Sequence, residues 1–430
     1  MIRISLIISS LLLFSVIAMA QNKDKSEHES PQVRCGTENA MEELYHNHPE
    51  SLIENEEFEQ FTKRFVQNKS NAKGTLDQDY VIPVVFHILG SSYNYGTTVD
   101  LALVKKALIS TNEDFQGLRS DWEDVDPDFK SIRGKLNITF KLAQLDPDGN
   151  PTTGVVFHAK TSGFGNITSA IETKIKAIAW DNYKYMNVYI MRDLYADGDN
   201  YNSGVSWYPS TSMSTDGLAR VVYNGSYLAT NTDDNFRSIF THEFGHWLNL
   251  KHTFQGGCTY PNDFVSDTPP AETTHMGLCD NNKLNCEGKK TNGDNFMDYT
   301  DCYNMYSKGQ VTRMQAALQH SARYPLWQHD NLVATGLLTS SSISDRNIQD
   351  ATRIFPNPAN KFLRIELDET QDLNNINISM INIVGVSVKI DIKHSGNAYN
   401  VDISNLNEGI YFLDINYGKQ KVVKKVYIAR

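Results

Sequence analysis

The pattern of apolar and polar positions divides the chain into a larger region, in which strands alternate with helices, and a smaller region of strands only. Residues 80–89 are mostly apolar and often β-branched, which predicts a buried strand, and the apolar spacing over 98–115 predicts a helix. Further strands are expected at 136–145, 186–191 and 217–223, and a further helix at about 167–180. This alternation predicts an α/β (α+β) domain with a mixed, twisted sheet at residues 78–330.

The pattern changes after residue 330. Residues 331–352 are polar and rich in serine, which predicts a linker. Beyond them Leu363 and Ile365 alternate with charged residues, and residues 411–417 repeat this period of two. The sequence therefore predicts a small antiparallel β-sandwich at 353–430.

The N-terminal residues carry a targeting pattern. Arg3 precedes an apolar run at 4–17, and Ala18-Met19-Ala20 follows it, which is typical of a secretory signal peptide at residues 1–20. The run is too short to span a bilayer comfortably. Residues 21–77 are polar, with short helical patterns, and are expected to form an accessory segment before the large domain.

Composition and charge narrow the classes of partner. The 430 residues include 40 Lys and Arg against 51 Asp and Glu, a net charge of −11. This balance argues against nucleic acid or anionic lipid as the main partner. Export permits disulfides, so the five cysteines are interpreted as an extracellular set: four lie close together and Cys35 stands alone.

The candidate chemistry lies at residues 241–252. His242 and His246 are one helical turn apart, so both imidazoles can reach one metal ion, and Glu243 lies beside them. If the chain bends near Asn249, His252 completes three nitrogen ligands and leaves one position of a zinc ion for water. The alternatives are surface histidines on an ordinary helix and a purely structural zinc site. A structural zinc site usually has four protein ligands and needs no acid beside a bound water, so Glu243 argues against a purely structural site.

These residues resemble the long zinc motif of the metzincin metallopeptidases, H-E-x-x-H-x-x-G-x-x-H, whose second mark is a downstream methionine turn. Here the turn is supplied by residues 295–299, which contain Met297 and Tyr299. The sequence around the motif resembles the pappalysin (cytophagalysin-like) family over roughly residues 80–325. The matching segments are 242–254, Gly256-Gly257-Cys258, Asp267-Thr268-Pro269, 295–299 and 308–314. Asn249 replaces the glycine of the pattern, and asparagine is the residue that best tolerates positive φ after glycine.

The resemblance implies a zinc endopeptidase and roles for particular residues. Glu243 would take the proton of a zinc-bound water and pass it to the leaving amine. Met297 would form a hydrophobic floor under the ligands, and Tyr299 would stabilise the oxyanion. For Tyr299 an ordinary packed aromatic is the alternative.

The four clustered cysteines lie between the zinc motif and the methionine turn, or just after it. Sequence alone allows three pairings. The family resemblance implies Cys258 with Cys286 and Cys279 with Cys302. A cysteine zinc site is the rival interpretation, but the paired C-x-x-C spacing is missing.

Two further ion-related features are expected. Asp263, Asp267 and Thr268 offer oxygen ligands for Ca²⁺, as family members do near this loop, although a solvated acidic loop explains the same residues. Cys35, within Arg34-Cys35-Gly36, resembles the cysteine switch of metzincin zymogens, in which a thiolate occupies the water position of zinc. Residues 21–77 would then be a propeptide. A spare thiol that pairs between molecules is the alternative.

The C-terminal region resembles a type IX secretion sorting domain, on the basis of Phe355-Pro356-Asn357-Pro358, residues 406–412 and the basic end at 421–430. A carbohydrate-binding or adhesive sandwich is the rival. Together these features predict a secreted zinc endopeptidase that cleaves extracellular proteins or peptides, is exported by the type IX machinery and keeps no transmembrane segment after signal removal. The alternative is a zinc-stabilised binding or adhesion protein without proteolytic activity.

Overall fold

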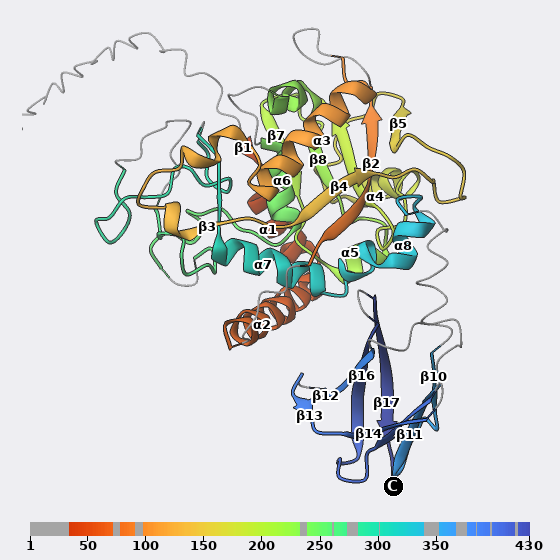
Figure 1. Ribbon diagram of the computed structural model, residues 1–430. Coiled ribbons are helices and arrows are strands. Elements are labelled where there is room, and N and C mark those ends of the chain that lie inside the picture. Colours follow the sequence, from red (N-terminus) through yellow and green to blue (C-terminus); the bar gives the residue numbers. More distant parts are fainter. Residues whose placement is uncertain are drawn as a thin grey trace, which may run out of the picture.

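A computed structural model shows the fold of the chain (Figure 1). The described residues are 34–71, 78–90, 98–232, 239–259, 262–272, 283–300, 302–338, 352–366, 376–383, 385–395, 398–417 and 420–430. The predicted signal peptide lies outside them. None of the helices in this described part combines the length and the hydrophobicity needed to cross a bilayer.

The large domain is built on one seven-stranded sheet in the order β1-β7-β8-β6-β2-β4, with β5 paired to β2. All neighbouring pairs are parallel except β7 with β8, so β1 and β7 run antiparallel to the other five strands of the sheet. The strands are β1 (Arg34–Cys35), β2 (Tyr80–Leu89), β4 (Ile138–Leu142), β5 (Val155–His158), β6 (Met186–Met191), β7 (Asn202–Ser206) and β8 (Val221–Asn224). The predicted mixed α/β sheet is confirmed.

Both faces of the sheet are covered, because alternate residues of each strand point to opposite sides. On one face Val84 and Phe86 of β2 pack in one core with residues of α3 (Leu101–Gln116) and α6 (Ile239–Trp247). On the other face Tyr189 and Met191 of β6 pack with residues of α1 (Thr37–Asn47) and α4 (Ser169–Lys176). The helix α6 that carries the predicted zinc ligands is therefore enclosed between the sheet and the rest of the domain, and all its residues are buried.

The two ends of helix α3 are determined by local sequence. Asp100 precedes it and accepts a hydrogen bond from the backbone amide of Leu103 at 2.8 Å, which satisfies one of the free donors at the helix start. Gly117 ends the helix at φ 62°, a conformation that glycine adopts without steric cost. The predicted helix at 98–115 is thus confirmed, with its start three residues later.

The remaining elements of the large domain are short, except for two helices. Helix α2 (Pro49–Asn71) follows α1, and α7 (Lys308–Gln319) follows the predicted methionine turn. The others are α5 (Thr211–Thr215), α8 (His329–Ala334), the 3₁₀ helices Ser120–Glu123, Lys130–Ile132, Gly225–Thr232 and Tyr324–Trp327, and a small sheet of β3 (Arg133–Gly134) with β9 (Tyr306–Ser307).

The predicted start of the linker is wrong. Residues 331–334 belong to α8, and the carbonyl oxygen of Thr335 accepts hydrogen bonds from the backbone amides of Gln144 and Leu145. This segment packs on the large domain because Leu332 and Thr335 are buried there. The rest of the predicted linker, residues 339–351, lies outside the described residues.

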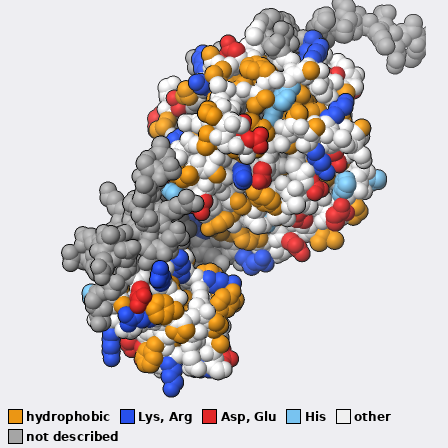
Figure 2. Space-filling model, turned by 90° about the vertical axis from the view of Figure 1, so that its right-hand side faces the viewer, with side chains coloured by type: hydrophobic (Ala, Val, Ile, Leu, Met, Phe, Trp, Pro, Cys, Tyr) orange, Lys and Arg blue, Asp and Glu red, His pale blue; other side chains and the backbone are white. Residues whose placement is uncertain are grey.

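The C-terminal region forms two four-stranded antiparallel sheets around its own core, which confirms the predicted β module. Leu363 and Ile365 are fully buried, as their alternation predicts. The strands are β10 (Arg353–Phe355), β11 (Phe362–Glu366), β12 (Ile376–Asn382), β13 (Ser387–Val388), β14 (Asp391–Ser395), β15 (Ala398–Asp402), β16 (Gly409–Tyr417) and β17 (Gln420–Ile428). Figure 2 shows basic side chains spread over this module, and those that are exposed include Arg353, Lys361, Lys389, Lys393 and Lys425.

Candidate metal centre

Three histidines converge in the large domain. His242 and His246 lie one turn apart on α6, and the chain then turns sharply at Asn249, which has φ 70°. The turn returns His252 to the same point, so asparagine at this position adopts the conformation that the glycine of the family pattern provides. All three side chains are buried.

The donor atoms fit a zinc ion. The three Nε2 atoms of His242, His246 and His252 are each 3.1 Å apart. Nitrogen ligands at about 2.0–2.1 Å from a tetrahedral zinc ion lie about 3.3 Å from each other. Burial lowers the pKa of His242 to about 3, with a smaller contribution from His252, and lowers that of His246 well below its ordinary value. The rings of His242 and His246 are therefore neutral near pH 7, as metal ligands must be.

The Nδ1 atoms fix the ring orientations. His242 Nδ1 donates to the carbonyl oxygen of Phe296 at 2.7 Å, and His246 Nδ1 donates to that of Leu250 at 2.7 Å. His252 Nδ1 donates to a carboxylate oxygen of Glu38 at 2.8 Å. A proton on each Nδ1 leaves the Nε2 lone pair free for a metal, which is the usual arrangement around protein-bound zinc.

Glu243 is fully buried beside the ligands. Neither carboxylate oxygen makes a hydrogen bond of ordinary geometry to the described residues. Burial raises its pKa to about 8, and the nearby Cys35 thiol and Ser206 hydroxyl oppose part of this rise. A carboxylate that is costly to bury without a partner points to a bound water or cation at this place.

The strand β7 comes unusually close to Glu243. A Cβ atom added to Gly204 would lie 2.5 Å from the carboxylate carbon of Glu243, so a larger residue at position 204 would displace the Glu243 carboxylate. A similar approach brings Met297 under α6, where a Cβ atom on Gly245 would lie 2.5 Å from the Met297 sulfur. Met297 is fully buried there, and its role as a hydrophobic floor under the ligands stays a prediction.

Tyr299 lies against the histidines. Its ring is 4.9 Å from that of His252, nearly perpendicular to it, and its hydroxyl donates to the backbone carbonyl of Cys35 at 3.2 Å. Burial raises the pKa of this phenol well above its usual range.

Cys35 joins the same cluster from the N-terminal segment. Its sulfur and one donor nitrogen of each of the three histidines all lie within 4.8 Å of one another, and no other group of this kind is found among the described residues. Burial raises the pKa of the thiol well above its ordinary value, with Glu243 adding to the rise. A cation between the four atoms would reverse this effect, because metal coordination deprotonates a thiol.

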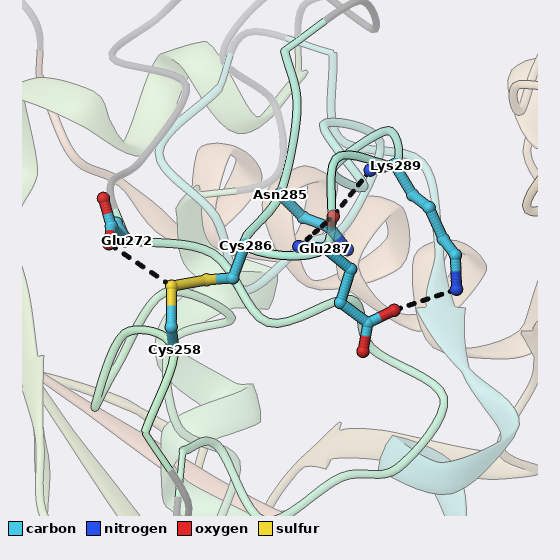
Figure 3. Close-up of a disulfide and its surroundings, with 6 residues drawn as sticks. All are labelled: Cys258, Glu272, Asn285, Cys286, Glu287 and Lys289. Carbon is cyan, nitrogen blue, oxygen red and sulfur yellow. Dashed lines mark hydrogen bonds and ion pairs between the residues drawn. A yellow bond between two sulfur atoms is a disulfide. The ribbon is translucent and has the colours of Figure 1, made fainter.

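Cys258 and Cys286 form a disulfide (Figure 3), the pairing that the resemblance implies. The hydrogen bonds around it are local: Asn285 Oδ1 accepts from the amides of Glu287 and Lys289. Cys279 lies outside the described residues, so its pairing with Cys302 stays a prediction.

In the acidic loop that follows Cys258, the oxygen atoms of Asp263, Asp267 and Thr268 already form hydrogen bonds within the protein. The Thr268 hydroxyl donates to Asp263, whose other oxygen accepts from the amide of Val265 at 3.0 Å. Asp267 accepts from the Ser307 hydroxyl at 2.6 Å and from the amide of Gly309 at 2.9 Å, so it holds the start of α7. Burial raises the pKa of Asp263 to about 7.

The N-terminal segment covers this centre and contributes contacts that the sequence did not predict. Strand β1 pairs with β7, and Gly36 N donates to Gly204 O at 2.9 Å. On α2, Glu59 forms a two-point ion pair with the buried Arg313 of α7, one bond of which measures 2.8 Å. No local pattern distinguishes Glu59 or Glu38 from the other acids of this polar segment, so only the fold reveals their partners.

Comparison with known proteins agrees with this geometry. Residues 169–319 match the family described as pregnancy-associated plasma protein-A, and residues 353–429 match the secretion system C-terminal sorting domain. An extracellular metalloprotease of Sordaria macrospora is 38% identical over 149 residues, which make up 32% of this chain and 50% of that protein. The chain thus spans about half the length of this relative. An extracellular metalloprotease of Podospora anserina is 25% identical over 71% of this chain and 95% of the relative.

Solved structures extend the comparison. A mutant of Tannerella forsythia promirolysin has 25% identity and a TM-score of 0.57, covering 71% of this chain and 99% of that one. Mature mirolysin of the same organism, in complex with a cleaved peptide, has 26% identity and a TM-score of 0.51, covering 60% and 98%. The sorting domain and the extracellular relatives indicate that the protein is secreted. The resemblance to the pappalysin family is thus confirmed for the part of the large domain that the family model matches, residues 169–319, and residues 353–429 match a C-terminal secretion sorting domain.

Proposed function

We propose that this chain is the precursor of a secreted zinc endopeptidase, which hydrolyses peptide bonds of extracellular proteins with Glu243 as the general base. The observation that carries the proposal is the triangle of three Nε2 atoms, 3.1 Å on each side, with the unpaired carboxylate of Glu243 next to it. A bound zinc ion supplies a Lewis acid that polarises the scissile carbonyl and lowers the pKa of water.

The residues of the chain have separate tasks in this proposal. His242, His246 and His252 would hold the ion through their Nε2 atoms. Glu243, the residue after His242 on α6, takes a proton from the attacking water and passes it to the leaving amine. Tyr299 donates a hydrogen bond to the developing oxyanion once its hydroxyl is released from the carbonyl of Cys35.

The N-terminal segment makes the precursor latent. Cys35 supplies a fourth ligand where water would bind, and the backbone of this segment already pairs with β7 at the edge of the sheet. The proenzyme structure of mirolysin covers a larger share of this chain than the mature structure does, which supports a propeptide within residues 21–77. Residues 1–20 would be the signal peptide and residues 353–430 the signal for type IX export.

Replacing Cys35 by alanine should shorten the latent period. Without the thiolate of Cys35, the fourth position of a bound zinc ion would be open to water while the segment is still docked, so self-cleavage should begin earlier. The measurement is the time course of propeptide loss on a gel, started from freshly purified full-length chain. Glu42→Ala, on the exposed face of α1, is the matched control. An unchanged time course would show that Cys35 does not maintain latency.

The proposed activity has a direct test. The activated protein should digest casein, a zinc chelator should abolish digestion, and added zinc should restore it. A zinc-stabilised binding or adhesion protein would bind zinc equally well but leave casein intact. Intact casein after complete removal of the N-terminal segment would contradict the proposal.

Binding of Ca²⁺ at the loop that contains Asp263, Asp267 and Thr268 is not needed for the proposed activity. The oxygens of Asp263, Asp267 and Thr268 would need to exchange present partners, such as the amide of Gly309, for the ion. The interpretation as a hydrogen-bonded loop that holds α7 accounts for the same residues. Calcium at this loop therefore stays a prediction.

A further inference from the structure

The three histidines of the zinc centre are not oriented by the same part of the chain. His242 and His246 donate from Nδ1 to backbone carbonyls at 2.7 Å, and both carbonyls belong to the large domain. The partner of His252 Nδ1 is the Glu38 carboxylate at 2.8 Å, which belongs to α1. Removal of the propeptide therefore leaves two of the orienting partners in place and takes the third away.

The contact with Glu38 fixes the state of His252. An ionised carboxylate only accepts hydrogen bonds, so the proton of the ring is on Nδ1 and the lone pair of Nε2 faces the other two histidines. A carboxylate in this position also makes the imidazole a more basic ligand than a backbone carbonyl does. His252 is 1% exposed and Glu38 36%, so this hydrogen bond is sheltered on the histidine side.

The backbone places Cys35 and Glu38 together. Gly36 N donates to Gly204 O, and the Thr37 hydroxyl oxygen accepts from the amide of Ser206 at 3.0 Å, so consecutive residues are held on β7. A Cβ atom at position 36 would lie 1.7 Å from the Tyr195 hydroxyl, so glycine suits this position between Cys35 and Glu38. One short segment thereby supplies both the thiol and the carboxylate.

We infer that Glu38 is a positioning residue for the zinc ion, and that residues 35–38 make the precursor hold zinc more tightly than the mature protein. The inference rests on the proposed function, because it assumes zinc at the three histidines. Two negative groups, a thiolate and a carboxylate, balance the double charge of zinc in the precursor. Both leave with the propeptide, so the ion becomes easier to extract and a stronger Lewis acid at the moment of activation.

The test uses the full-length chain with Glu243→Ala, which prevents self-cleavage and keeps the segment attached. Zinc affinity is measured by competition with a chromophoric chelator. Adding Glu38→Ala should weaken zinc binding about 10- to 100-fold, the usual effect of losing such a partner. Glu38→Gln should give an intermediate affinity, because the amide oxygen still accepts the hydrogen bond but carries no charge. Glu42→Ala, on the same helix and exposed, should leave the affinity unchanged.

Replacing zinc with cobalt shows whether a Glu38 variant weakens metal binding through the orientation of His252 or because the N-terminal segment has left the site. A thiolate-to-cobalt charge-transfer band shows that Cys35 is still bound, and it should persist in both Glu38 variants while their affinity falls. The inference is overturned if Glu38→Ala binds zinc as tightly as the background protein, or if the band disappears along with the affinity. A background protein that binds no zinc would instead overturn the proposed function itself.

Discussion

Replacing Glu243 by alanine is expected to lower kcat/KM on protein substrates by about 100- to 10,000-fold, the range for removal of a general acid–base group. The carboxylate is buried with no hydrogen-bond partner of ordinary geometry among the described residues, and β7 closes over it at Gly204. No other acid is positioned by the described structure to take over its proton transfer. Activity is measured with a quenched fluorescent peptide after an added protease has removed the N-terminal segment from both the variant and the unmodified protein.

The control for this experiment is the zinc content of the Glu243→Ala variant. Glu243 is not one of the ligating groups, so the variant should keep one zinc per chain and its thermal midpoint should not fall. Glu243→Gln serves as the matched variant, since it keeps the volume next to Gly204 but cannot accept a proton. Cleavage by either variant at the rate of the unmodified enzyme would exclude the proposed mechanism.

The second large effect is expected from His252→Ala. This change removes one of three neutral ligands and leaves a two-histidine site, so zinc affinity should fall by at least about 100-fold, more than the loss of an outer partner costs. Casein cleavage should fall with it. Metal analysis after dialysis against a weak chelator measures the loss.

His46→Ala is the control for this variant, because His46 is exposed at the end of α1 and hydrogen-bonds only its neighbour Asn47 among the contacts described. It should retain zinc and activity. Full zinc content in His252→Ala would show that the third ligand is another group.

Much of the fold and of the metal centre follows from local sequence. Period-two alternation in residues 363–365 and the apolar run at 80–89 predict strands that the structure contains. The ligand spacing works because an α-helix places His242 and His246 one turn apart. The bend at Asn249 was predictable because few residues tolerate positive φ.

Other features depend on contacts between distant parts of the chain. Glu38 and His252 are 214 positions apart and meet only because β1 pairs with β7. The close approach of Gly204 to the Glu243 carboxylate joins two elements, β7 and α6, and the sequence of β7 alone does not reveal it. The linker was predicted to start too early because the hydrogen bonds that hold Thr335 come from Gln144 and Leu145, which are distant in the sequence.

The central claim is that three imidazoles hold one zinc ion next to Glu243. The most direct measurement combines elemental analysis with zinc X-ray absorption spectroscopy on the purified full-length chain carrying Glu243→Ala. The account predicts one zinc per chain, with three nitrogen ligands at about 2.0–2.1 Å and one sulfur at about 2.3 Å. A folded protein with no stoichiometric zinc, or a zinc ion without imidazole ligands, would contradict it.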